Sequence, residues 1–247
     1  MKRRLTHGLI ALTLAVAVAV TGTVRPAPAH AAPVRTTVDI GTIIAVAKGL
    51  IDLWKTFKGG GMSIEAATRQ ILAAIDSAKT DIIAHMDRLA AAEARACAER
   101  HVIELADIER FSTDTLQAWA QNATGCVTLI DSLLGTVTDK AAVDVLGAAL
   151  DVVGPIALIA RSRAGFSVTG LTAVLASGNN KVINVLMPQC IFVSGWNPPY
   201  ITRSVCIAYN GDRAEVLNKF YDDALRLQAM RNTSWVVAKY AAPVYAA

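Results

Sequence analysis

The sequence lacks the compact motifs by which many enzymes are recognised. It contains no Gly-x-Ser-x-Gly nucleophile elbow, no His-Glu-x-x-His metal motif, no dinucleotide-binding glycine fingerprint and no calcium-binding loop. Histidine is scarce as well, because two of the four histidines fall within the first 31 residues. An enzyme is therefore the less favoured class, although catalytic groups scattered along the chain could still converge in space.

A concentration of basic residues is also missing from most of the chain. The whole sequence has 24 Lys and Arg against 20 Asp and Glu, a net charge of +4. Four basic residues and no acidic ones lie within residues 1–31, so the remainder carries 20 of each sign. No later stretch combines clustered Lys and Arg with aromatic residues. We therefore expect no nucleic-acid partner.

Residues 1–31 have the order of features typical of a signal peptide. Three basic residues at positions 2–4 precede an uncharged run over residues 9–20, and the small residues Ala29 and Ala31 follow. The run has about 12 residues, whereas a permanent membrane anchor needs roughly 20. The sequence predicts export to the outside of the cell, with cleavage near Ala31.

The four cysteines all lie beyond this segment. In an exported chain an even number favours disulfides, and no Cys-x-x-Cys spacing points to a metal site. Three pairings are formally open. The two short loops favour Cys97 with Cys126 and Cys190 with Cys206. We expect no metal and no cofactor.

Apolar spacing indicates a mainly α-helical protein. Hydrophobic residues make up 53% of the chain and aromatic ones only 6%, which suits an aliphatic core. Residues 39–57 have helical spacing and end at three glycines. A second helix is expected to start at the cap residue Ser63 and to continue beyond Ala96, since residues 63–123 contain neither Gly nor Pro.

The first pair of cysteines constrains this helical region. An unbroken helix would place Cys97 and Cys126 about 44 Å apart, whereas a disulfide needs Cα atoms within about 7 Å. We therefore expect a break at Phe111–Ser112, where capping residues begin, and a disulfide-linked antiparallel hairpin. A further helix stop is expected at residues 122–125.

Residues 127–187 are strongly apolar and favour a hydrophobic helical hairpin over residues 141–176. Its only acidic residues are Asp144 and Asp151, its turn is expected at residues 161–163, and another turn at residues 177–180. Two interpretations stay open. The hairpin is either the core of a large helical bundle, which is favoured, or an element that inserts into a membrane.

The C-terminal part differs in composition from the helical region before it. Two β-prone runs surround a Gly/Pro/Asn turn within residues 188–209, clamped by the second cysteine pair, and a helix is expected at about residues 213–231. The turn offers a rigid candidate binding loop. The alternative is that its tryptophan folds back onto the bundle. The loop residues are Trp196, Pro198, Pro199 and Tyr200.

The remaining candidates for chemistry are scattered polar side chains. Helical spacing brings Asp81 near His85 and His101 near Glu104, and Asp107 follows. We expect ordinary hydrogen bonds from these pairs. An enzyme would need several of the five to converge in one pocket.

The sequence thus predicts a signal peptide (1–31), a helical bundle (32–187) and a disulfide-clamped segment with a C-terminal helix (188–247). The leading hypothesis for function is an exported, non-enzymatic binding module with an unknown protein or cell-surface partner. A membrane-active protein that inserts the 141–176 hairpin is the alternative. An enzyme without a recognisable motif comes third.

Overall fold

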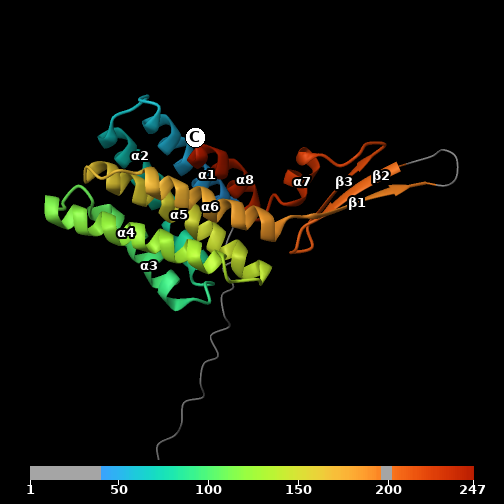
Figure 1. The fold of residues 1–247 in the computed structure, drawn as a ribbon, viewed down its shortest axis with the longest axis horizontal. Coiled ribbons are helices and arrows are strands. Elements are labelled where there is room, and N and C mark those ends of the chain that lie inside the picture. Colours follow the sequence, from blue (N-terminus) through green and yellow to red (C-terminus); the bar gives the residue numbers. More distant parts are fainter. Residues whose placement is uncertain (1–39, 196–201) are drawn as a thin grey trace, which may run out of the picture. The chain divides into compact units, whose positions relative to one another are not determined.

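Helices make up most of the computed structural model, which describes residues 40–195 and 202–247 (Figure 1). These residues belong to one compact unit formed by residues 37–247. The mainly α-helical fold expected from the sequence is confirmed. The elements in chain order are α1 (Ile40–Lys58), α2 (Ile64–Met86), α3 (Ala92–Glu104), a 3₁₀ turn (Leu105–Asp107), α4 (Thr113–Leu134), α5 (Lys140–Arg163), α6 (Thr169–Leu186), β1 (Gln189–Ser194), β2 (Thr202–Ile207), β3 (Arg213–Leu217), α7 (Asp223–Ala229) and α8 (Trp235–Ala246).

Polar caps define where several helices begin. The side-chain oxygens of Ser63, Ser112 and Asp139 accept hydrogen bonds from backbone N–H groups in the first turns of α2, α4 and α5, at 3.2, 3.2 and 2.9 Å. Such bonds satisfy donors that a helix start otherwise leaves without a partner. The predicted start at Ser63 is confirmed.

Helix α5 is the core of the bundle. Its residues 143–160 are all buried, and it packs against α1, α2, α3, α4, α6 and α8. In Figure 1, α4, α5 and α6 lie side by side. By length and composition α5 alone among the described helices could cross a membrane, yet 94% of its most apolar window is buried inside the protein. A helix that is apolar on every side is what the centre of a large bundle requires.

Small residues let α6 approach α5 closely. A Cβ atom on Gly154 would lie 2.5 Å from a methyl of Leu175, and one on Gly178 would lie 2.6 Å from a methyl of Leu150. The turn predicted at residues 177–180 is wrong, because α6 runs through it. There Gly178 makes room for α5, and the Asn179 amide donates to the Leu175 carbonyl within the helix, at 2.9 Å.

The helix expected to run unbroken from Ser63 is divided in two. α2 ends at Met86, and a turn leads to α3. Leu89 is buried within this turn, and Arg95 donates to the carbonyl of Asp87 at 3.3 Å. Tertiary packing of one leucine outweighs the helical propensity of the segment, so this prediction is wrong.

The reversal predicted near Ser112 is confirmed. The chain leaves α3 through the 3₁₀ turn, and α4 returns so that Cys97 and Cys126 form a disulfide with a Cα–Cα distance of 5.6 Å. The stop predicted at residues 122–125 is wrong. α4 continues through Gly125, because Ala123 and Val127 remain on its buried face.

The three strands form an antiparallel sheet in the order β1-β2-β3. Cys190 lies opposite Cys206, and the two form the second predicted disulfide. The helix predicted over residues 213–231 is wrong at its start, where the chain forms β3, and only its later part is helical, as α7. Buried Ala214 and half-buried Val216 alternate with exposed neighbours, a period of two that fits a strand.

A buried carboxylate ties the turn after β2 to the core helix. Asp144 of α5 accepts hydrogen bonds from the Tyr209 hydroxyl, at 2.7 Å, and from the Ser234 backbone N–H, at 2.6 Å. Burial, followed by the charge of Asp144, raises the pKa of Tyr209, so its hydroxyl stays protonated and remains a donor. The chain therefore has a polar anchor where the sheet region meets α5.

Candidate functional site

The binding loop predicted from the sequence lies outside the described residues. Trp196, Pro198, Pro199 and Tyr200 fall in the gap between residues 195 and 202, so their role stays a prediction. The strands on both sides of the gap are described, and their surfaces can be analysed.

Exposed apolar side chains concentrate in the C-terminal region. Of the ten large hydrophobic side chains that are exposed in the described residues, nine lie between residues 187 and 227. Ile103 on α3 is the exception. Patches of this kind on soluble proteins mark interaction surfaces more often than isolated exposed residues do. The nine are Met187, Ile191, Phe192, Val193, Ile207, Leu217, Phe220, Tyr221 and Leu227.

One face of the sheet is covered by α7. The disulfide and Ala214 belong to this face and pack with Leu225 and Ala229 in a small core of their own. On the same face the ring of Phe192 stacks on that of Phe220, with centroids 4.1 Å apart. This cluster holds β1 and β2 against the helix.

The opposite face, which we call the open face, has four exposed apolar residues. The strand register places side chains in rows across the sheet, so that residues opposite one another share a face. Val193 and Leu217 flank Arg203, where a hollow of about 250 Å³ forms. The exposed fractions are 53% for Ile191, 40% for Val193, 40% for Ile207 and 57% for Leu217.

The polar residues of the open face are linked to one another. Glu215 accepts from Arg203 at 3.5 Å and from Arg213 at 2.6 Å. One carboxylate shared by two guanidinium groups leaves this face with a net positive charge. The open face is thus an apolar surface with a small basic excess.

Strand β1 forms an edge of the sheet and carries none of the usual protective features. Its sequence, Gln189–Ser194, contains neither a charged residue nor a proline, and within the described residues it pairs only with β2. Proteins commonly protect such edges with charges, prolines or bulges, because an unpaired edge can accept another strand. β1 therefore offers both unpaired backbone groups and exposed apolar side chains.

The scattered polar residues do not assemble into a catalytic pocket. His85 is buried on α2, where the Arg88 guanidinium contacts its ring, and burial followed by the charge of Arg88 lowers the pKa of His85 to about 3. Asp81 lies half-buried on the same helix, and the described residues contain no hydrogen bond between it and His85.

His101 lies in a different environment. Its ring hydrogen-bonds to the Cys97 carbonyl at 2.7 Å and packs near Trp119, and burial lowers its pKa. Glu104 accepts from the indole N–H of Trp119 at 2.8 Å, and Asp107 pairs with Arg110 at 3.2 Å. Among the residues that the structure describes, no three His, Cys, Asp or Glu side chains lie close enough together to hold a metal ion.

An acidic side chain lies buried in the core. Asp151 of α5 is fully buried, and neither carboxyl oxygen has a hydrogen-bond partner among the described residues. Burial raises its pKa well above the usual range, although the Asn179 amide offsets part of that effect. The buried hydroxyl of Tyr245 also lacks a partner, and burial, followed by the charge of Asp151, raises the pKa of Tyr245. Tyr245 contributes to the lining of a hollow of about 540 Å³, but its hydroxyl is buried, and Asp151 lines none of the hollows in the described part of the chain. We assign both groups to the core.

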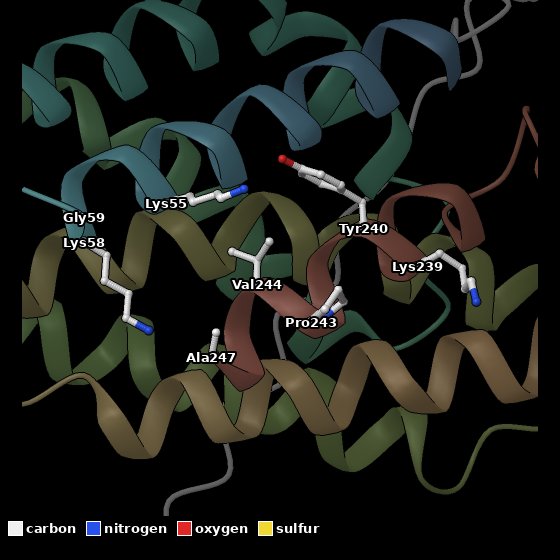
Figure 2. Close-up of a pocket in the computed structure, with 8 residues that line it drawn as sticks. All are labelled: Lys55, Lys58, Gly59, Lys239, Tyr240, Pro243, Val244 and Ala247. Carbon is white, nitrogen blue, oxygen red and sulfur yellow. The ribbon is translucent and has the colours of Figure 1, made fainter. Parts of the chain in front are cut away.

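A separate hollow of about 680 Å³ lies between α1 and α8 (Figure 2). We call it the α1–α8 groove. Figure 2 shows Lys55 of α1 pointing toward Tyr240 of α8, and Lys58 pointing toward Ala247 at the end of α8. The complete lining is Lys55, Lys58, Gly59, Lys239, Tyr240, Pro243, Val244 and Ala247.

Comparison of the chain with protein-family models, with curated proteins and with solved structures finds no match.

Proposed function

We propose that this chain is an exported binding protein that captures an extended peptide segment of a partner along strand β1. The observation that supports the proposal is the edge strand, which is uncharged, free of proline and exposed. A partner segment would add a fourth strand by backbone hydrogen bonds, and its apolar side chains would cover Ile191 and Val193. The two disulfides fit an oxidising environment, and the signal-peptide pattern of residues 1–31 supports export.

The composition of the surface supports an extended apolar partner. Side chains of a strand alternate between faces, so a partner with apolar residues at every second position would contact the open face. The shared carboxylate of Glu215 leaves a basic excess there, which favours a partner with an acidic residue beside the apolar ones. The disulfide between Cys190 and Cys206 keeps β1 in place. Strand β1 therefore loses little conformational entropy when a partner binds.

A random library of 12-residue peptides, selected on the oxidised chain from residue 32 onward, tests the proposal. We expect enrichment of peptides with alternating apolar residues. Val193→Lys places a charge on the edge strand and should weaken their binding about tenfold or more. Ile103→Lys adds the same charge at the exposed apolar residue of α3 and should leave binding unchanged.

Two outcomes would contradict the proposal. One is a selection that enriches no peptides with alternating apolar residues. The other is an enriched set that binds the Val193→Lys and Ile103→Lys variants equally well. Circular dichroism of both variants establishes that they are folded.

Membrane insertion of the 141–176 hairpin is the second proposal, supported by the length and apolar composition of α5. It requires α5 to leave contacts with six other helices. Dye release from liposomes by the oxidised protein, blocked by an engineered disulfide between α5 and α4, would favour it over peptide capture. Absence of release across pH and lipid charge would remove it.

A further inference from the structure

The α1–α8 groove combines an apolar lining with unpaired positive charge. Pro243 and Val244 of α8 line it, and Pro243 is exposed although it lies within the helix. Every charged side chain in the lining is a lysine. On the open face of the sheet, by contrast, the two arginines share the carboxylate of Glu215.

The acidic side chains near the groove are already engaged or lie outside its lining. Ala247, whose main-chain carboxyl ends the sequence, belongs to the lining and forms no ion pair within the described residues. Asp52 accepts a hydrogen bond from the Tyr240 hydroxyl, and the Asp223 carboxylate is 3.9 Å from the Lys239 ammonium. Lys55 and Lys58 form no ion pair with any residue that the structure describes. Two ammonium groups therefore remain for a ligand.

Helix electrostatics explain only part of this arrangement. Lys55 and Lys58 lie in the last turn of α1, where cations favour the negative end of the helix dipole. That effect accounts for lysines at this end of the helix. It does not account for Lys239 on α8, nor for the apolar side chains exposed between the two helices.

We propose that the α1–α8 groove binds a long-chain carboxylate, such as a free fatty acid, as a single molecule. Its head group would lie within reach of the lysine ammonium groups of α1, and its acyl chain would cover Val244, Pro243 and the ring of Tyr240. A hollow of about 680 Å³ falls within the range of small-molecule sites, roughly 300–1,000 Å³. A concave groove can enclose a single acyl chain, whereas a protein that docks to a bilayer uses a protruding apolar face.

Titration with cis-parinaric acid, a fluorescent 18-carbon carboxylate, tests the site below the concentration at which the probe forms micelles. We expect saturable binding that oleate displaces and that neither oleyl alcohol nor acetate displaces. Lys55→Ala with Lys58→Ala should weaken binding about tenfold or more, because the positive charge that attracts the head group is lost. The matched control, Lys79→Ala with Lys140→Ala, removes the same charge elsewhere and should not.

A second variant tests the apolar part of the groove without a change in charge. Val244→Trp fills space between α1 and α8 and should also lower affinity, while urea unfolding and circular dichroism report whether the variant is folded. The proposal is overturned by absence of saturable binding, by equal losses in the two double-lysine variants, or by equal displacement with oleyl alcohol. A further contrary result is that anionic vesicles displace the probe as well as monomeric oleate does, at equal concentrations of accessible lipid. That result would show that the groove binds a bilayer surface, and it would overturn the fatty-acid site.

Discussion

At the scale of single residues, two kinds of buried polar side chain can be distinguished. Asp144 is satisfied by Tyr209 and Ser234, and so it ties two segments of the chain together. Asp151 lies about two helical turns further along α5 and has no hydrogen-bond partner in the described part of the chain. A buried ionised carboxylate without a partner is costly, so the neutral form of Asp151 is favoured.

The raised pKa of Asp151 makes the stability of the protein depend on pH. The folded state keeps this proton at pH values where the unfolded chain has lost it. The contribution of the protonated carboxyl to the free energy of unfolding is therefore complete below about pH 4, and it declines as the pH rises through the folded pKa. Asp151→Asn cannot ionise. Its unfolding free energy should therefore exceed that of the wild type by an amount that grows with pH, by up to about 1.4 kcal/mol per pH unit.

Urea unfolding at pH 5, 6, 7 and 8 measures this difference. Asp76→Asn removes an exposed carboxylate from α2 and serves as the control for the loss of one carboxylate. A difference for Asp151→Asn that does not grow with pH would show that Asp151 is already ionised in the folded protein.

At the scale of elements, close helix contacts decide which glycines are required. A Cβ atom on Gly147 of α5 would lie 2.6 Å from the Ser234 hydroxyl and 2.9 Å from a methyl of Val182. Gly125 of α4 has no neighbouring atom within 4 Å. The two glycines occupy helix interiors, yet only the first is needed for packing.

Alanine substitution should therefore have opposite effects at these positions. Gly147→Ala overpacks the region where α5 meets α6 and Ser234, and should lower the unfolding free energy by about 1–3 kcal/mol. Gly125→Ala should raise it by up to about 1 kcal/mol, because alanine favours the helix over glycine. Thermal or urea unfolding measures both, and stabilisation by Gly147→Ala would contradict the packing described for α5.

The same contacts explain which elements the sequence could predict. The hydrophobic run of α5 and the cap at Ser63 carry local signals, and the disulfide distance implied the reversal near Ser112. The turn predicted at residues 177–180 failed because Gly178 is a packing residue, and its partner Leu150 is 28 positions away in the chain. Local patterns cannot distinguish a glycine that ends a helix from one that lets two helices meet.

The binding loop predicted from the sequence, residues 196–200, lies outside the described residues and stays a prediction. The cysteine spacing led to a clamped C-terminal segment, and the structure contains both disulfides. The open face was missed, because Arg213–Leu217 looks helical by composition and forms β3 only beside β2. Alternation of Ile191 and Val193 was the available signal. The α1–α8 groove joins residues about 190 positions apart, and no local pattern reports such a distance.

At the scale of the whole molecule, the chain divides its apolar residues between two roles. The helical region buries its aliphatic side chains around α5, whereas residues 187–227 expose nine large ones. A small core under α7 and one disulfide hold the sheet together. An element with little core of its own and a large exposed apolar surface is well suited to partner binding, since the partner supplies the missing burial.

Hydrogen exchange along the whole chain, with and without a selected alternating peptide, tests whether a peptide binds along the edge strand β1. We expect the amides of α5 to exchange slowest in the free protein, and those of Gln189–Ser194 that point away from β2 to exchange fast. Saturating peptide should slow exchange at β1 and leave the α5 amides unchanged, because a fourth strand satisfies the edge. Slower exchange confined to other elements, with β1 unaffected, would contradict capture along the edge strand.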